Sequence, residues 1–311
     1  MTPSAMSVEF ACPVHKIAMG ADLFCPECNR HYPSVDGIPI LLNEADSVFQ
    51  TSDYLDPGRA YGGASSYAGH LDKRTGIRQL YRRLLYRLSE AGPPRRDYDV
   101  GNAVDHIHAS LPGARILVVG AGDTSLAGSV VYTDVAFGKN VTCIADAHDL
   151  PFLDQSFDAC VACAVLEHVA DPYRCVDEMI RVLRPGGFVY AETPFMQPVH
   201  MREHDFTRFT FLGHRRLFRR FDEIRSGIVG GPGMSAGQML RYAIVASSGR
   251  PVLRKWLRLV SLLLTYPLRW LDLLSYAKPG GYDSASAFYF FGTLRGTAIT
   301  DRELLRYFRG T

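Results

Sequence analysis

The stretch Ile116-Leu-Val-Val-Gly120-Ala-Gly122-Asp123 decides the fold of this 311-residue chain. Its first half is a short, continuously apolar run rich in β-branched residues, as a strand buried on both faces requires. Its second half places two glycines where the backbone must turn sharply and approach a ligand that a Cβ would push away. A buried strand followed by such a turn is typical of an α/β sheet that binds a nucleotide.

Further apolar runs follow this stretch and predict alternating strands and helices. The expected strands cover residues 130–135, 141–145, 159–162 and 188–192, and one helix is expected over 172–183. This alternation favours a parallel sheet. Asp134 stands at the end of the second strand, a position that accepts hydrogen bonds from ribose hydroxyls in doubly wound folds.

Five blocks of sequence between Ile116 and Glu192 carry a family resemblance. They are residues 118–123, 130–134, 145–152, 164–172 and 181–187. In this order they resemble the class I S-adenosylmethionine-dependent methyltransferases, especially the type 11 methyltransferase domain found in ubiquinone and menaquinone biosynthesis enzymes. The resemblance covers about a quarter of the chain. It implies a Rossmann-like, seven-stranded α/β methyltransferase sheet with helices on both faces.

The resemblance also implies a binding site for S-adenosylmethionine. Gly120 and Gly122 would line the methionine portion, Asp134 would hold the ribose, Asp146 with Ala147 would face the adenine, and the residues around Cys163 would form the pocket floor. The complete expected set is Gly120, Ala121, Gly122, Asp123, Asp134, Asp146, Ala147, His148, Cys163 and Ala164.

Two features depart from the usual pattern. Only fourteen positions separate Gly120 from Asp134, against a spacing of about twenty in this kind of fold. Thr124 also stands where a third glycine is usual. We therefore expect a clipped or irregular first crossover helix, and two interpretations stay open: a functional cofactor site, or a degenerate domain without catalysis.

A second motif lies near the N-terminus. Cys12-Pro-Val-His15 and Cys25-Pro-Glu-Cys28 are two ligand pairs, each with the spacing that grips one edge of a tetrahedral ion. Three thiolates and one imidazole suit structural zinc and leave no ligand position open for water. The segment resembles the small zinc subunit that activates tRNA and release-factor methyltransferases, which implies that this zinc-ribbon-like module docks on the catalytic part of the same chain.

The chain divides into four expected regions. These are a zinc-binding module over 8–45, a linker or lid over 46–75, the methyltransferase domain over 76–225 and a helical substrate-cap region over 226–311. An amphipathic helix is expected over 77–88. In the tail, polar residues form one narrow stripe along a mostly apolar helix over 254–272 that Pro267 kinks. This helix is either a core or dimer helix, or a helix lying on a membrane through residues 251–276.

Candidates for a general base follow the fifth expected strand, where ligands bind in open α/β sheets. They are His200, His204 and Asp205, because imidazole titrates near neutral pH and a carboxylate can orient it. The alternative is that both histidines are structural or position the substrate. His168 is interpreted as structural.

The leading hypothesis is an O-methyltransferase acting on a small molecule, a sugar or a lipid-linked glycan. Methylation of RNA or a protein is the alternative. The sequence argues against it, because residues 163–166 do not form the Asn-Pro-Pro-Tyr-like tetrapeptide that enzymes methylating planar nitrogens often carry. A non-catalytic partner of another methyltransferase is a third hypothesis. The formal net charge of +2 gives no argument for a nucleic-acid partner.

The cysteine content and the N-terminal sequence indicate where the protein is located. Seven cysteines without a secreted disulfide pattern, and no visible signal peptide, favour the cytoplasm, with membrane contact at its inner face as the second expectation. The acceptor and the oligomeric state stay open.

Overall fold

The computed structural model describes residues 8–55 and 93–311. Their centre is one mixed sheet, in the order β10-β11-β9-β8-β5-β6-β7-β4-β3. The bounds are β3 Ser34–Val35, β4 Ile38–Leu41, β5 Arg115–Val119, β6 Ser129–Asp134, β7 Cys143–Ala145, β8 Phe157–Cys163, β9 Leu183–Pro194, β10 Phe221–Gly230 and β11 Ala287–Leu294. The four strands expected after Gly122 overlap β6, β7, β8 and β9.

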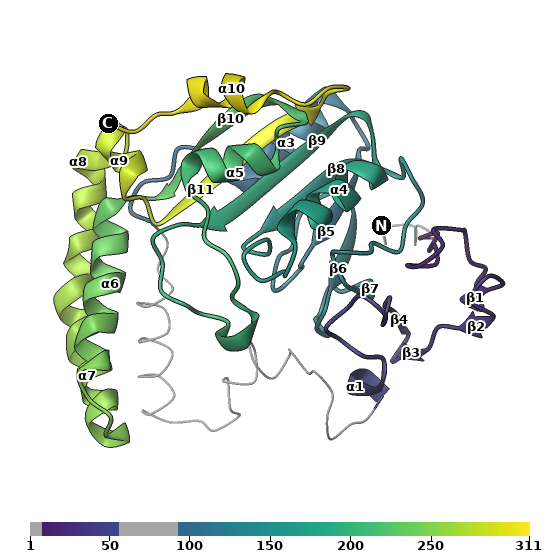
Figure 1. The fold of residues 1–311 in the computed structure, drawn as a ribbon, viewed down its shortest axis with the longest axis horizontal. Helices are drawn as coiled ribbons and strands as arrows, with labels where there is room; N and C mark the ends of the chain where they lie inside the picture. The colour runs from purple at the N-terminus through teal and green to yellow at the C-terminus, as the bar shows by residue number, and fades with distance from the viewer. Residues whose placement is uncertain (1–7, 56–92) are drawn as a thin grey trace.

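The sheet is parallel from β9 through β7, and β11 and β10 add an antiparallel hairpin at one edge. The helices α3 Val100–Ser110, α4 Pro172–Val182 and α5 Phe211–Leu217 lie against it (Figure 1). Side chains of β5 alternate between two cores: Ile116 packs in the core that contains α3, and Leu117 in the core that contains α4. The predicted α/β sheet with helices on both faces is confirmed.

The connection between β5 and β6 contains no helix. It is a loop over 120–128, whereas parallel strands usually need a crossover of about a dozen residues or more. Gly128 closes this loop at φ +96°, and a Cβ there would lie 2.6 Å from Nε2 of His108 on α3. The short sequence spacing thus correctly predicted a clipped crossover.

The N-terminal residues extend the same sheet. A hairpin of β1 Phe24–Cys25 and β2 Arg30–His31 precedes a second hairpin of β3 and β4, and a short helix α1 covers Ser52–Leu55. Strand β4 pairs in parallel with β7, with Ile40 opposite Ile144 and Leu41 opposite Ala145. The sheet therefore has nine strands, because β3 and β4 of the N-terminal module add to the seven strands β5–β11.

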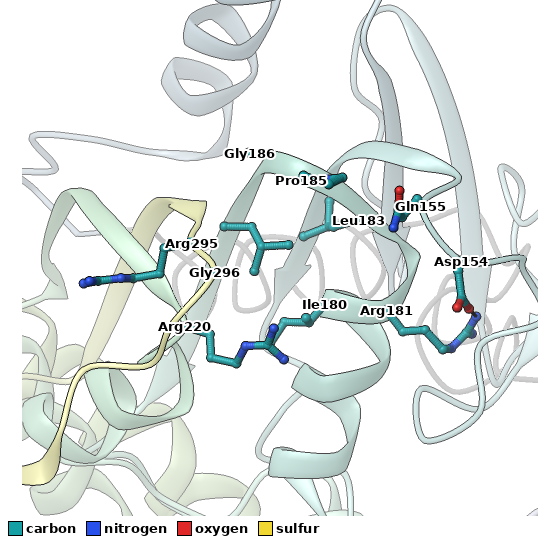
Figure 2. A pocket seen from close by; sticks show the side chains of 11 residues that line it. Asp154, Gln155, Ile180, Arg181, Leu183, Pro185, Gly186, Arg220, Arg295 and Gly296 are labelled. Carbon is teal, nitrogen blue, oxygen red and sulfur yellow. Dashed lines mark hydrogen bonds and ion pairs between the residues drawn. The ribbon is translucent and has the colours of Figure 1, made fainter.

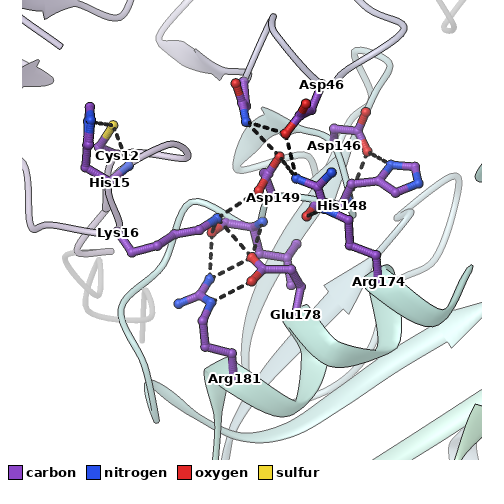
Figure 3. A network of polar contacts seen from close by, with 12 residues as sticks. Cys12, His15, Lys16, Asp46, Asp146, His148, Asp149, Arg174, Glu178 and Arg181 are labelled. Carbon is purple, nitrogen blue, oxygen red and sulfur yellow. Dashed lines mark hydrogen bonds and ion pairs between the residues drawn. The ribbon is translucent and has the colours of Figure 1, made fainter. Parts of the chain in front are cut away.

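A polar network joins this module to α4 and to the loop after β7 (Figure 3). Lys16 Nζ lies 3.4 Å from Asp149 Oδ1 and 3.0 Å from Glu178 Oε2. Arg174 Nη2 reaches Asp46 at 3.0 Å and Asp149 at 2.7 Å. Because Asp149 takes part in both sets of contacts, the module and the sheet share one network of charges.

The C-terminal elements interrupt the β10–β11 hairpin. Between these strands lie α6 Pro232–Ala246, α7 Pro251–Thr265, the 3₁₀ helix η3 Tyr266–Leu271, α8 Asp272–Ser275 and α9 Pro279–Asp283, and after β11 come α10 Asp301–Leu304 and η4 Leu305–Tyr307. The expected boundary between residues 225 and 226 falls inside β10, and β11 returns to the sheet.

Two further expectations concern the helices. In the described parts of the chain, no helix is long and apolar enough to cross a membrane. The α-helix expected to kink at Pro267 changes to 3₁₀ geometry at Tyr266. The expected helix over 77–88, and residues 56–75 of the expected linker, lie outside the described residues.

The tail was predicted to be a core or dimer helix, and the core alternative is wrong, because only the C-terminal part of its polar stripe faces inward while Arg254 and Arg258 are exposed. The dimer alternative stays a prediction. Ser261, Thr265 and Asp272 are buried, whereas Leu263 and Leu264 are 57% and 66% exposed. The apolar side of α7 therefore faces solvent.

Candidate functional site

The strands β5, β6, β7 and β8 are parallel, so their carboxyl ends meet at one edge of the sheet. At this edge Gly120 and Gly122 adopt φ +70° and +49°, which L side chains rarely do. A Cβ on Gly120 would lie 2.3 Å from Cγ2 of Val165 in the loop after β8. Position 120 thus requires glycine for two reasons: its backbone conformation, and the lack of space for a Cβ beside Val165.

The residues that follow Gly120 in this loop differ in burial. Ala121 is buried and its N–H donates to the Thr133 carbonyl at 2.9 Å, which ties the loop to β6. Gly122 and Asp123 are exposed. The expected cofactor loop is therefore anchored at its first half and accessible at its second half.

Asp134 lies beside this loop, as the sequence predicted. Its Oδ2 accepts from the Gly122 N–H at 2.8 Å and its Oδ1 from the Ala136 N–H at 2.9 Å. Burial raises the pKa of Asp134 in spite of these hydrogen bonds. The carboxylate is thus fixed next to the exposed part of the loop, and each oxygen retains lone pairs for a further donor.

Asp146 directly follows β7 and is linked to the N-terminal region. Its Oδ2 accepts from Ser47 Oγ at 2.6 Å, and its Oδ1 accepts from the backbone N–H and Nδ1 of His148 at 3.0 and 2.6 Å. Nε2 of His148 accepts from the Asp171 N–H at 3.0 Å, which assigns the ring proton to Nδ1. Burial acts to raise the pKa of Asp146, but the hydrogen bonds from His148 outweigh this effect and lower it. Ala147 is buried between these groups.

Strand β8 ends at Cys163, and the loop after it begins at Ala164. Ala164 is exposed and has φ +55°, and its N–H donates to the Glu192 carbonyl of β9 at 3.0 Å. The Glu192 carboxylate pairs with Arg96 and accepts from Tyr190 Oη at 2.6 Å. Glu192 and Arg96 were not among the predicted site residues; Arg96 lies before α3, where no sequence motif marks it.

A second cluster forms where the loops after β8 and β9 meet. The side chain of Glu167 is fully buried, and its Oε1 lies 3.5 Å from His168 Nε2 and 3.7 Å from His200 Nε2. The backbone carbonyl of Glu167 accepts from the Phe206 N–H at 2.8 Å, which holds the two loops together. Burial raises the pKa of the Glu167 carboxyl to about 8.

His200 is oriented from its other side. Its Nδ1 lies 3.4 Å from both Asp205 Oδ2 and Arg208 Nη2, and Asp205 is itself held by a two-pronged pair with Arg208. Burial opposes ionisation of Asp205, but the bonds from Arg208 hold its pKa at about 2. In the tautomer whose Nδ1 donates to Asp205, the imidazole can accept a proton at Nε2.

The structure separates the two predicted histidines. His200 faces Asp205 and Glu167, whereas the His204 ring stacks on Phe49 with ring centroids 5.7 Å apart. The backbone carbonyl of His204 accepts from His168 Nδ1 at 2.8 Å. Burial lowers the pKa of His168 to about 4, so this residue is neutral and positions the loop.

The N-terminal motif forms a compact cluster of donor atoms. One ligand atom from each of Cys12, His15, Cys25 and Cys28 lies within 4.8 Å of the others. His15 Nδ1 is 3.2 Å from Cys28 Sγ, 3.7 Å from Cys25 Sγ and 3.8 Å from Cys12 Sγ. Such separations match the corners of a tetrahedron with metal–ligand distances of about 2.0–2.3 Å.

An open depression of about 390 Å³ lies at the opposite edge of the sheet (Figure 2). It is lined by the start of β9, the end of α4 and the residues that flank β10 and β11, including Arg181, Arg220 and Arg295. Arg181 is already paired with Asp154 and Glu178. Since ligands in this fold bind at the carboxyl ends of the strands, this depression is separate from the candidate site.

Residues 106–191 match the protein family described as "Methyltransferase domain". An uncharacterized methyltransferase from Mycolicibacterium vanbaalenii is 47% identical over 68 residues, which cover 22% of this chain and 26% of that protein. Another from Mycolicibacterium paratuberculosis is 32% identical over 137 residues, 42% of this chain and 51% of that protein.

A solved structure of phosphoethanolamine N-methyltransferase 2 from Haemonchus contortus, in complex with S-adenosyl-L-methionine, aligns with 74% of this chain and 60% of its own length at 14% identity and a TM-score of 0.40. The chain spans between a quarter and about half of the length of the two curated relatives described above. The family match and the descriptions of these relatives support a methyltransferase domain within this chain.

The buried carboxyl of Glu167 predicts a dependence of stability on pH. Its pKa of about 8 in the folded protein exceeds the ordinary value of 4.5, so the folded state binds this proton more tightly than the unfolded state. The contribution of this proton to the free energy of unfolding is fully present below about pH 4.5 and is lost as pH rises towards 8. Between about pH 5 and pH 7.5 we expect the free energy of unfolding of the wild type to fall by roughly 2–3 kcal/mol relative to Glu167→Gln.

Urea unfolding at the two pH values measures this difference. The matched control is Glu203→Gln, because Glu203 is exposed on the same loop and its substitution should leave the pH dependence unchanged. Parallel pH profiles for the wild type and Glu167→Gln would contradict the assignment of a buried, protonated carboxyl.

Proposed function

We propose that the chain is an S-adenosylmethionine-dependent methyltransferase whose cofactor lies along the carboxyl ends of β5, β6, β7 and β8. The observation that carries the proposal is the placement of Asp134 beside the exposed half of the Gly120–Gly122 turn. The Asp134 carboxylate would accept the ribose hydroxyls, and Ala147, beside Asp146, would face the adenine. The match of residues 106–191 to the methyltransferase domain supports the same assignment.

S-adenosylmethionine, when bound, supplies an electrophilic methyl group on a sulfonium that departs as a neutral thioether. The protein therefore has to align the acceptor, exclude water and, for a hydroxyl acceptor, remove one proton. We propose His200 Nε2 as the proton acceptor and Asp205 as the group that fixes the ring. Glu167, protonated near neutral pH, leaves the positive charge of protonated His200 to be balanced by Asp205.

The acceptor we propose is a hydroxyl group of a small molecule, a sugar or a lipid-linked glycan. The support is the His200–Asp205 pair, because a hydroxyl must lose a proton on methylation and needs a base nearby. His200 is about one third exposed, so an acceptor can reach its ring.

We further propose that Cys12, His15, Cys25 and Cys28 hold a structural zinc ion. Four soft or borderline donors at tetrahedral separations support zinc, and all four positions are filled by protein atoms. In this position the ion would fix the turn that presents Lys16 to Asp149 and Glu178. It would stabilise the docked module and take no part in methyl transfer.

Cofactor binding is tested by calorimetry with S-adenosylmethionine. Asp134→Ala should weaken the affinity by tenfold or more, since each hydrogen bond to a charged group contributes about 1.5–3 kcal/mol. Asp134→Asn, which keeps one acceptor oxygen, should fall between this variant and the wild type. Asp105→Asn on the exposed side of α3 is the control.

Unchanged affinity in Asp134→Ala would contradict the proposed site. A wild-type protein that does not bind at millimolar concentration would instead favour the non-catalytic alternative. The specific observation behind that alternative is the loop without a helix between β5 and β6.

The base is tested by transfer of a radiolabelled methyl group from S-adenosylmethionine into pooled metabolites, glycans and lipids. His200→Ala should lower the incorporation by about 10²–10⁴-fold with little change in cofactor affinity, because general-base catalysis contributes that much. His204→Ala, whose ring stacks on Phe49, should have a smaller effect. Equal rates for both variants and the wild type would rule out both histidines.

The zinc proposal is tested by atomic absorption on the purified protein. We expect about one zinc ion per chain, and its loss together with lower thermal stability in Cys25→Ser. Cys143→Ala, which removes a buried thiol of β7 outside the cluster, should retain the metal. A wild-type protein that is stable, folded and free of zinc would contradict the proposal.

A further inference from the structure

The helical hairpin of α6 and α7, with η3, packs through small and polar residues. A Cβ on Gly233 would lie 2.2 Å from the Leu268 carbonyl oxygen, and one on Gly237 would lie 3.0 Å from the Thr265 carbonyl oxygen. Ser261 is fully buried in the same arrangement. Glycines four residues apart that admit a second helix this closely are typical of helix pairs surrounded by lipid.

A buried carboxylate fixes the base of this hairpin. Asp272 is fully buried, and its oxygens accept from the N–H groups of Gly231 at 3.1 Å, Gly233 at 2.6 Å and Met234 at 3.3 Å. It thereby satisfies the first free N–H groups of α6. Because the polar groups are used inside the hairpin, the apolar side chains are held outside.

Large apolar side chains are exposed along a surface that is formed by α6 and α7, side by side at one side of the molecule (Figure 1), and by η3, which follows α7. A soluble monomer rarely exposes a large contiguous apolar patch unless it binds something. We call this surface the hairpin face, and its exposed large members are Met239, Leu240, Tyr242, Val252, Leu253, Trp256, Val260, Leu263, Leu264, Trp270 and Leu271.

The charge of the hairpin has one sign. Residues 232–271 contain six basic side chains and no acidic one. Four of the six, Arg250, Arg254, Lys255 and Arg258, are exposed around the start of α7. Their long side chains can follow an apolar surface while the charged ends reach a polar layer.

We propose that the hairpin face is a docking surface for an anionic lipid bilayer. Exposed tryptophan, leucine and valine would enter the boundary of the acyl chains, and the basic side chains would contact anionic headgroups. The hairpin would lie in the plane of the interface. This inference does not depend on methyl transfer.

Charge argues against the two other occupants. A second copy docked through the same face would bring four exposed basic side chains from each copy to the interface, without an acidic partner. Residues 77–88 of this chain carry four arginines and no acidic residue, so they do not complement the face either. An anionic bilayer supplies the opposite charge to the exposed basic side chains.

The chain carries its own probe for this proposal. It has only two tryptophans, Trp256 and Trp270, and both belong to the hairpin face, where they are 63% and 53% exposed. Full-length protein is titrated with vesicles of phosphatidylcholine containing one quarter phosphatidylglycerol, and with vesicles of phosphatidylcholine alone. We expect a blue shift of tryptophan emission and about tenfold or stronger partitioning on the anionic vesicles.

Paired variants separate the apolar and the charged contributions in a vesicle sedimentation assay. Leu263→Glu with Leu264→Glu should lower binding by tenfold or more, whereas Leu305→Glu with Phe308→Glu, at exposed positions elsewhere, should not. Arg254→Gln with Arg258→Gln should weaken binding to anionic vesicles only. Its control is Arg302→Gln with Arg306→Gln, an equally spaced exposed pair near the C-terminus.

Three results would overturn the proposal. The first is equal sedimentation of the wild type and the Leu263/Leu264 variant. The second is tryptophan emission without vesicles that is already blue-shifted and resists iodide quenching, which would mean that the chain covers the face itself. The third is a dimer in analytical ultracentrifugation that the Leu263/Leu264 variant dissociates.

Discussion

The parallel pairing of β5 with both β6 and β8 is the constraint on which the candidate site depends. It sets Val119, Asp134 and Cys163 at the same edge, so that the three connections that follow them meet in space. The steric requirement at Gly120 reinforces this arrangement, because Val165 from the loop after β8 occupies the space of a Cβ. A substitution in either loop is therefore expected to disturb the other.

The N-terminal module is an integral part of this arrangement. Its strand β4 pairs with β7, and the segment that follows places Ser47 against Asp146 at 2.6 Å. The Cys and His cluster, the Lys16 contacts and the position proposed for the adenine thus form one connected series of interactions (Figure 3). A module of this size cannot bury enough apolar surface alone, and here it gains stability from the sheet that it extends.

The sequence predicted the elements whose signals are local. The apolar, β-branched run at Ile116, the glycine turn and the cysteine spacings each specify their own geometry, and the fourteen-residue spacing correctly implied a loop without a full helix. The placement of Glu167 in the core could not be predicted, because it depends on the return of the loop that carries His200 and Phe206. The same limit applies to the β4–β7 pairing, which joins residues about a hundred positions apart.

The tail shows a different kind of failure. The polar stripe along α7 was recognised, but the burial of its members Ser261 and Thr265 was not, since an apolar helix usually turns its apolar side inward. Gly233 and Gly237 decide the direction, because only glycines let α6 approach the α7–η3 backbone closely enough to enclose Ser261 and Thr265. Those glycines lie about thirty residues before Thr265 and Leu268, the backbone positions that they approach.

The central claim is that the turn at Gly120–Gly122 and the carboxylate of Asp134 enclose one adenosyl group. A crystal structure of the protein with S-adenosylhomocysteine tests it most directly. We predict that both ribose hydroxyls lie within hydrogen-bond distance of Asp134, with the adenine beside Ala147. A nucleoside found elsewhere, or a soaked crystal in which the loop and Val165 leave no room for it, would contradict the account.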